Sequence, residues 1–78
     1  MKYPNGMDVK LGDKVLIDGK YRGVVIANID GAEYSAEQPE AKWAYLGSGV
    51  MIDTDFGGLV HYQQESAADD SIELVSRG

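Results

Sequence analysis

Short runs of β-branched and aliphatic residues alternate with glycine-containing turns along most of the chain. Residues 13–17 form the first run and are followed by Asp18-Gly19, a pair that favours the positive φ angles of a tight hairpin turn. Residues 22–29 form the second run, are rich in Val and Ile, and end at Asp30-Gly31. The pattern therefore predicts that the two runs pair as a β-hairpin.

A third run covers residues 49–55. Successive side chains of a strand point to opposite faces, so Val50 and Ile52 are expected on one face and Met51 and Asp53 on the other. Residues 49–55 are therefore expected to form the third strand.

Two later runs complete the set of expected strands. Residues 59–63 return after a glycine-rich turn, and residues 71–75 form the last run, with Ile72 and Leu74 pointing inward. Residues 65–70 are polar and predict a loop between these strands. No internal repeat or low-complexity tract interrupts the pattern.

The segment before the third run has a different character. Pro39 can open a helix, residues 40–46 are compatible with one, and Gly47 lies where a helix would stop. Trp43 and Leu46 are three residues apart and would share one face of this turn. A bent entry into the next strand is the alternative interpretation.

Five short strands separated by glycine-rich turns indicate a mainly β protein. For a chain of 78 residues, curling one sheet on itself removes exposed edges without requiring a second layer. We therefore predict a small SH3-like antiparallel five-stranded barrel with one short helical turn near residues 39–46. The length corresponds to a single domain over residues 1–78.

The net charge of the chain and its distribution indicate which classes of partner to expect. The formal net charge is −6, and residues 1–22 carry +2 whereas residues 23–78 carry −8. An acidic balance argues against nucleic-acid binding, which requires clustered Lys and Arg. The uneven distribution of charge favours a basic protein partner, and plain solubility is the alternative explanation. The longest aliphatic run, residues 24–27, is too short to cross a membrane, and no signal peptide is recognisable, so we expect a cytoplasmic protein.

Candidate chemistry is sparse. His61 is the only histidine, no serine lies in a nucleophile elbow, and the chain has no cysteine. Asp53-x-Asp55 resembles the start of a calcium loop, but its twelfth position is Gln64 where a bidentate Glu is required. We expect no enzyme activity, no metal and no cofactor, and we expect His61 to be structural or part of a contact surface.

Aromatic and acidic residues give the clearest indication of a binding surface. Tyr and Trp are enriched at binding hot spots, although Trp43 and Phe56 are here expected to belong to the core. Asp53 and Asp55 would share one face of a strand and repel each other unless a cation or a basic partner lies opposite. The expected protein-binding face comprises Glu33, Tyr34, Glu37, Glu40, Tyr45, Asp53 and Asp55. An aromatic cage for a methylated lysine and a groove for proline-rich ligands are the alternatives.

Two resemblances accompany these patterns. Residues 11–15 (LGDKV) followed by residues 23–25 (GVV) resemble the first hairpin of SH3-like barrels, including the KOW type. Over residues 7–15, 23–27, 43–46 and above all 49–62, the chain resembles small bacterial immunity proteins encoded beside secreted antibacterial toxins, such as those of type VI secretion.

That second resemblance implies a protein that binds one cognate toxin tightly and blocks its active site, without catalysis of its own. A basic toxin of the nuclease type would match the acidic charge, since electrostatic attraction speeds association. The alternative is a small regulatory or scaffold domain that binds a peptide or a modified lysine. The sequence leaves the oligomeric state open.

Overall fold

The computed structural model describes residues 1–64 and 72–77, and the expected polar loop at residues 65–70 lies outside them. All five predicted strands and the helical turn are present. The elements are β1 (Asp13–Ile17), β2 (Tyr21–Asn28), α1 (Glu40–Trp43), the 3-10 turn η1 (Ala44–Leu46), β3 (Val50–Thr54), β4 (Gly58–Tyr62) and β5 (Ile72–Arg77).

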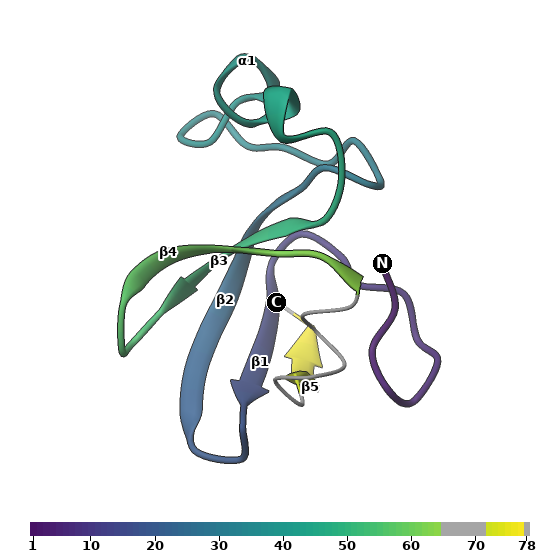
Figure 1. Ribbon diagram of the computed structural model, residues 1–78, viewed down its shortest axis with the longest axis vertical. Helices are drawn as coiled ribbons and strands as arrows, with labels where there is room; N and C mark the ends of the chain where they lie inside the picture. Colours follow the sequence, from purple (N-terminus) through teal and green to yellow (C-terminus); the bar gives the residue numbers. More distant parts are fainter. Residues whose placement is uncertain (65–71, 78) are drawn as a thin grey trace.

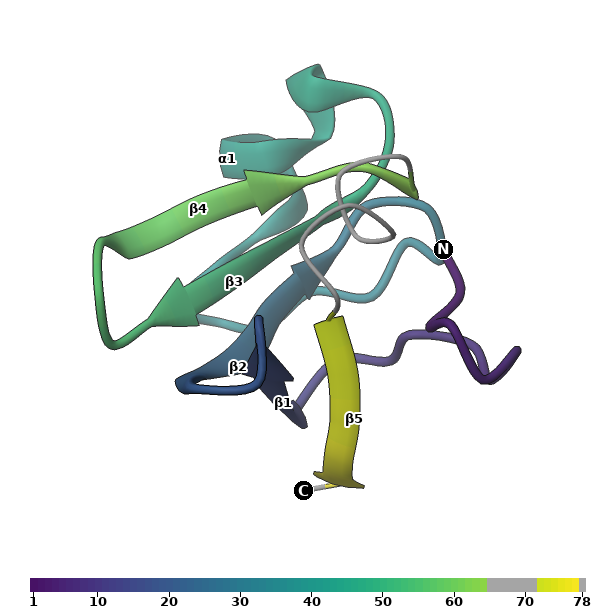
Figure 2. The ribbon, with the colours of Figure 1, turned by 60° about the horizontal axis from the view of Figure 1, so that its bottom comes forward.

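The five strands form one antiparallel sheet in the order β4-β3-β2-β1-β5 (Figure 1). The sheet twists strongly, so that β5 runs at a steep angle to β4 (Figure 2). Within the described part of the chain the hydrogen-bonded sheet is open, with β4 and β5 at its two ends. The mainly β architecture is thus confirmed, whereas the closure into a barrel that the sequence predicted is not seen.

The first hairpin forms as its turn residues predict. Asp18 and Gly19 have φ angles of 56° and 71°. Positive φ at both residues and a hydrogen bond from the Lys20 backbone N–H to the Ile17 carbonyl oxygen (3.2 Å) form the tight turn that the sequence predicted. The strands pair Lys14 with Val24 and Ile17 with Tyr21, so three residues (18–20) connect them, one more than in a two-residue hairpin loop.

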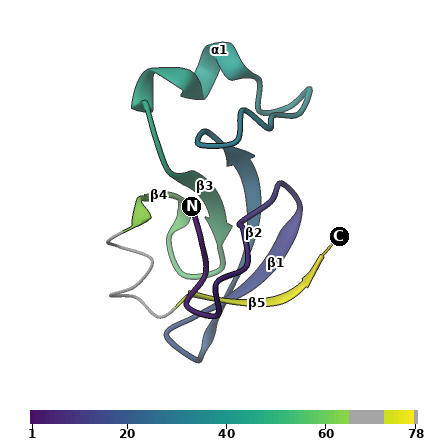
Figure 3. The ribbon, with the colours of Figure 1, turned by 90° about the vertical axis from the view of Figure 1, so that its right-hand side faces the viewer.

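The main hydrophobic cluster lies on the inner face of the sheet. Val15, Val25, Ile52 and Ile72 are each at most 2% exposed, and the neighbouring Leu74 packs against them as expected. The N-terminal segment crosses this face, as the side view shows (Figure 3), and adds Tyr3 and Val9 to the cluster. The remaining buried members of this inner cluster are Ile17, Val50 and Tyr62.

One buried carboxylate anchors the N-terminal segment to the inner cluster. Asp13 is 1% exposed and accepts hydrogen bonds from the Tyr3 hydroxyl (2.6 Å) and the Lys10 backbone N–H (2.9 Å). The Arg77 Nε lies 3.9 Å from its other oxygen. Burial, together with the hydrogen bond to Asp13, raises the pKa of the Tyr3 phenol. Asp13 is therefore a structural residue whose partners satisfy its charge.

A smaller cluster lies on the opposite, outer face. Ala27, Ile29 and Met51 are buried there, and Trp43 and Leu46 pack on them as half-buried neighbours. The expected common face of Trp43 and Leu46 is thus confirmed. The register of β2 against β3 shifts between Val25 and Ala27, and such a bulge re-aims the side chains that follow it. This outer cluster fastens the helical segment to one end of the sheet (Figures 1 and 3).

The expectation that Phe56 belongs to the core is wrong. Phe56 is 49% exposed, and its ring centroid lies 4.7 Å from that of Tyr21 at the tips of two hairpins. The turn between β3 and β4 extends past the end of the sheet, so its side chains have only one neighbouring strand to contact. An aromatic residue in a turn is buried only where the fold brings another element over it.

Candidate partner-binding surfaces

The seven residues expected at a binding face separate into three places. Glu33 is half-buried and accepts hydrogen bonds from the Asn28 side-chain amide (2.7 Å) and the Leu11 backbone N–H (3.1 Å). These two donors lower the pKa of the Glu33 carboxyl. Tyr34 is half-buried as well and packs against the outer cluster. Both residues hold the loop in place rather than offering free contact groups.

Glu37, Glu40 and Tyr45 lie on the segment that projects beyond the sheet, and we call them the acidic-aromatic segment (Figure 1). All three are exposed, and Tyr45, at 77%, is the most exposed of the large hydrophobic side chains described. Lys42 also lies on α1, with its ammonium 5.1 Å from the Trp43 ring centroid. The segment therefore exposes one tyrosine and two carboxylates to solvent.

Several hydrogen bonds stabilise this segment internally, and one ties its end to the sheet. The Trp43 indole N–H donates to the Gln38 side-chain oxygen at 2.8 Å, and the Gln38 backbone N–H donates to the Ser35 hydroxyl at 3.1 Å. Further along, the His61 Nε2 lies 2.8 Å from the Ser48 carbonyl oxygen. His61 thus ties β4 to the end of the segment, in agreement with the structural role expected of it. The exposed Tyr45 is carried on a supported turn.

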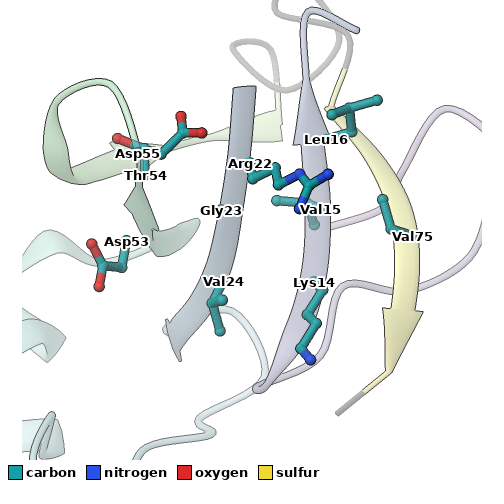
Figure 4. Close-up of a pocket in the computed structure, with 10 residues that line it drawn as sticks. All are labelled: Lys14, Val15, Leu16, Arg22, Gly23, Val24, Asp53, Thr54, Asp55 and Val75. Atoms are coloured by element: carbon teal, nitrogen blue, oxygen red, sulfur yellow. The ribbon is translucent and has the colours of Figure 1, made fainter. Parts of the chain in front are cut away.

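Asp53 and Asp55 lie elsewhere, on the uncovered part of the outer face (Figure 4). They border a shallow hollow of about 660 Å³ on the strands β1, β2, β3 and β5. We call this surface the open face. Its other exposed or half-buried members are Lys14, Leu16, Arg22, Val24 and Val75.

The open face carries both charge signs. Lys14 and Arg22 are exposed on β1 and β2, and Asp53 and Asp55 are exposed on and just after β3. None of the ion pairs found within residues 1–64 and 72–77 engages any of these four side chains. The basic first third of the sequence and its acidic remainder therefore do not separate in space, because β2 pairs with β1 on one side and with β3 on the other.

Sequence reasoning missed the exposed aliphatic residues of this surface and of the strand next to it. Val24 and Val75 border the hollow, and Leu59 on β4 pairs with Asp53. They are 39%, 64% and 44% exposed, although each belongs to a strand rich in aliphatic residues. The pairing of β1 with β2 explains the exposure of Val24, because it places Val24 opposite exposed Lys14, and the Asp18-Gly19 turn predicted the hairpin without predicting this register. A residue that pairs with a solvated lysine shares its face and is exposed with it.

The described side chains offer little for metal binding. Among residues 1–64 and 72–77, no three His, Asp or Glu side chains converge in a way that could hold a metal ion. The same residues include no helix with the length and apolar character needed to span a bilayer.

Comparisons of the chain with protein-family models, with curated proteins and with solved structures find no match. Functional inference accordingly depends on the two exposed surfaces described above.

Proposed function

We propose that this chain is a non-enzymatic protein-binding domain of the SH3-like type, and that the acidic-aromatic segment is its partner-binding surface. The exposure of Tyr45 on a supported turn is the observation that carries this proposal. A tyrosine contributes a large contact area and loses little conformational freedom when it binds, so it is favourable at hot spots. The strand order β4-β3-β2-β1-β5, with every pair antiparallel, is compatible with an SH3-like sheet.

The chemistry of the segment favours a basic partner. Glu37 and Glu40 are exposed on the same segment as Tyr45, and the whole chain carries a formal net charge of −6. Such a field accelerates the approach of a positively charged protein. We propose in particular an immunity protein that binds and neutralises a cognate bacterial toxin in the cytoplasm, as the sequence resemblance implies. A toxin of the nuclease type would be basic, because its substrate is a polyanion.

The test begins with tagged protein purified from its host at moderate salt, followed by identification of the proteins that co-elute. For the partner found, we expect Tyr45→Ala to weaken the equilibrium affinity at least tenfold through faster dissociation. The double variant Glu37→Lys with Glu40→Lys should slow association and reduce its dependence on salt. Asp53→Lys is the matched control on the open face and should leave this affinity unchanged.

Unchanged binding by Tyr45→Ala, in a protein whose circular dichroism is that of the wild type, would overturn the assignment of the surface. Recovery of a large housekeeping complex in place of a basic toxin-like protein would overturn the immunity proposal and favour a scaffold role.

A second candidate function is recognition of a modified lysine in a peptide. It is favoured by the contact between the half-buried Tyr21 ring and the exposed Phe56 ring, and by the chain's own Lys20 ammonium, which lies 5.1 Å from the Tyr21 centroid. Two adjacent rings attract an alkylammonium group through their electron-rich faces. Titration with a trimethyl-lysine peptide and with its unmodified form tests this reading. Preference for the modified peptide that is lost in Phe56→Ala would support it, and equal weak binding of both peptides would exclude it.

A further inference from the structure

One row of side chains crosses the open face from edge to edge. The strand register places Leu59 opposite Asp53, Asp53 opposite Val24, and Val24 opposite Lys14. On β5 the register shifts next to Lys14, and Val75 borders the hollow at that point. All five side chains are exposed, and the segment that contains α1 lies beyond the end of the sheet, away from the row (Figures 1 and 3).

The order of side-chain types along this row is apolar, acidic, apolar, basic, apolar. Reversing the row about Val24 exchanges its acid with its base and one aliphatic end with the other. A two-fold axis parallel to β2 and passing over Val24 performs this reversal when two copies meet face to face. We propose that the open face is a homodimer interface, in which Val24 contacts Val24 of the second copy and Asp53 faces Lys14 of the second copy.

The distance between strands explains why Asp53 and Lys14 do not pair within one chain. Neighbouring strands are about 4.8 Å apart, so Asp53 and Lys14 of one chain are separated by two spacings, or about 10 Å, with Val24 between them. Two sheets packed face to face lie about 10 Å apart, a gap that an Asp and a Lys side chain span from opposite sides. The dimer thus pairs charges that the monomer leaves apart, and Leu59 of one copy covers Val75 of the other.

The direction of the axis follows from charge. An axis perpendicular to the strands would bring Asp53 of one copy onto Asp53 of the other, and like charges in contact are destabilising. The axis parallel to β2 keeps Asp53 and Lys14 away from their own copies and pairs each with the opposite charge. Arg22 lies on β2 two residues from Val24, so it meets Arg22 of the second copy under this axis. Asp55 lies beside that pair in each chain, because its backbone N–H donates to the Arg22 carbonyl oxygen at 3.0 Å, and its carboxylate offsets the repulsion.

The test is the mass in solution by sedimentation velocity or light scattering, measured over a range of protein concentrations at low and high salt. We expect a species of about 17 kDa, twice the 8.5 kDa of one chain, that dissociates as salt rises. Asp53→Lys and Lys14→Asp should each weaken the dimer at least tenfold, because every substitution acts twice in a two-fold interface.

Two combinations make the test specific. The double variant Asp53→Lys with Lys14→Asp restores the complementarity and should regain the homodimer, and a one-to-one mixture of the two single variants should form a heterodimer. Glu40→Lys is the control, because it changes the net charge as Asp53→Lys does but lies on the acidic-aromatic segment.

Three outcomes would overturn the proposal: a wild-type protein that stays monomeric at millimolar concentration in low salt, a dimer that is indifferent to Asp53→Lys, or a double variant that stays monomeric. A monomer whose open face is instead occupied by a captured basic protein would assign the face to that partner. Because binding of the toxin-like partner is tested through Tyr45, failure of this proposal leaves the proposed function untouched.

Discussion

The inner and outer clusters pack on opposite faces of one sheet, yet they are built very differently. The inner cluster has nine buried residues drawn from all five strands and the N-terminal segment. The outer cluster has three buried residues, and its other members are only half-buried. The free energy gained by burying apolar side chains is roughly proportional to the area they remove from water, so the inner cluster supplies most of the stability. The outer cluster mainly orients the segment that carries Tyr45.

Among the substitutions that compare the two clusters, Ile52→Ala is expected to lower the free energy of unfolding the most. Ile52 is 0% exposed at the centre of the inner cluster, and truncation of such a residue leaves a cavity. We expect the free energy of unfolding to fall by about 3 to 4 kcal/mol, measured by urea denaturation. Met7→Ala, at an exposed position, serves as control and should change it by less than about 0.5 kcal/mol. A loss below about 1 kcal/mol for Ile52→Ala would show that the inner cluster is not the stabilising core.

Gly23→Ala should destabilise the inner cluster by adding an atom to it, whereas Ile52→Ala removes atoms from it. An ideal Cβ at Gly23 would lie 2.5 Å from the Ile52 Cγ2 atom, so the strands must move apart. The expected cost is about 2 kcal/mol. Gly57→Ala is the matched control, since its nearest neighbour would be 3.9 Å away.

The Ile52→Ala background gives an independent check on that explanation. It removes the Cγ2 atom, so the cost of Gly23→Ala should largely vanish there, and the two substitutions should couple in a double-mutant cycle. Strict additivity would mean that the backbone, and not this contact, requires glycine.

Met51→Ala examines the outer cluster. Met51 is 4% exposed but its neighbours Trp43 and Leu46 are half-buried and can relax, so we expect a loss of about 1 to 2 kcal/mol, at the low end for such truncations. Trp43 is the only tryptophan and reports on this site alone. Its fluorescence should shift to longer wavelength and change before the circular dichroism of the sheet during urea unfolding.

Tyr45→Ala is the control for that measurement, because it lies on the same segment without contributing to the outer cluster. Coincident fluorescence and circular dichroism transitions in Met51→Ala would contradict the separation of the two clusters.

The smallest effect is expected at the ion pair between the N-terminal ammonium and Asp30, which are 3.1 Å apart. Burial opposes ionisation of Asp30, but the Gly49 backbone N–H and the N-terminal ammonium outweigh it and lower the pKa of the Asp30 carboxyl. A lowered pKa contributes stability that is complete above the unfolded-state value near 4 and is lost as pH falls through the folded-state value.

Asp30→Asn should therefore cost less than about 1 kcal/mol at pH 7, since the partly exposed carboxylate is screened by water. The difference from the wild type should narrow towards pH 3, as measured by thermal unfolding at several pH values. A difference that grows as the pH falls would contradict this assignment.

Much of the fold was predictable because its signals are local. The Asp18-Gly19 turn, the strand runs and the helical turn after Pro39 depend on backbone preferences and on side-chain periodicity, which neighbouring residues determine. The exposure of the residues predicted for a binding face followed from the sequence only in part. The sequence predicted Glu33 as a contact residue of the binding face. In the structure its carboxylate accepts hydrogen bonds from Asn28 and Leu11 and holds the loop in place.

By itself, the amino-acid sequence determined a mainly antiparallel β domain, the position of its first hairpin turn and its acidic net charge. Only the tertiary structure decided which aliphatic residues stay exposed, that Phe56 lies outside the core, and that Lys14 shares a face with Asp53. The physical reason is that turn geometry and alternation act between residues close in the sequence. Burial and charge pairing depend instead on strands brought together from distant parts of the chain.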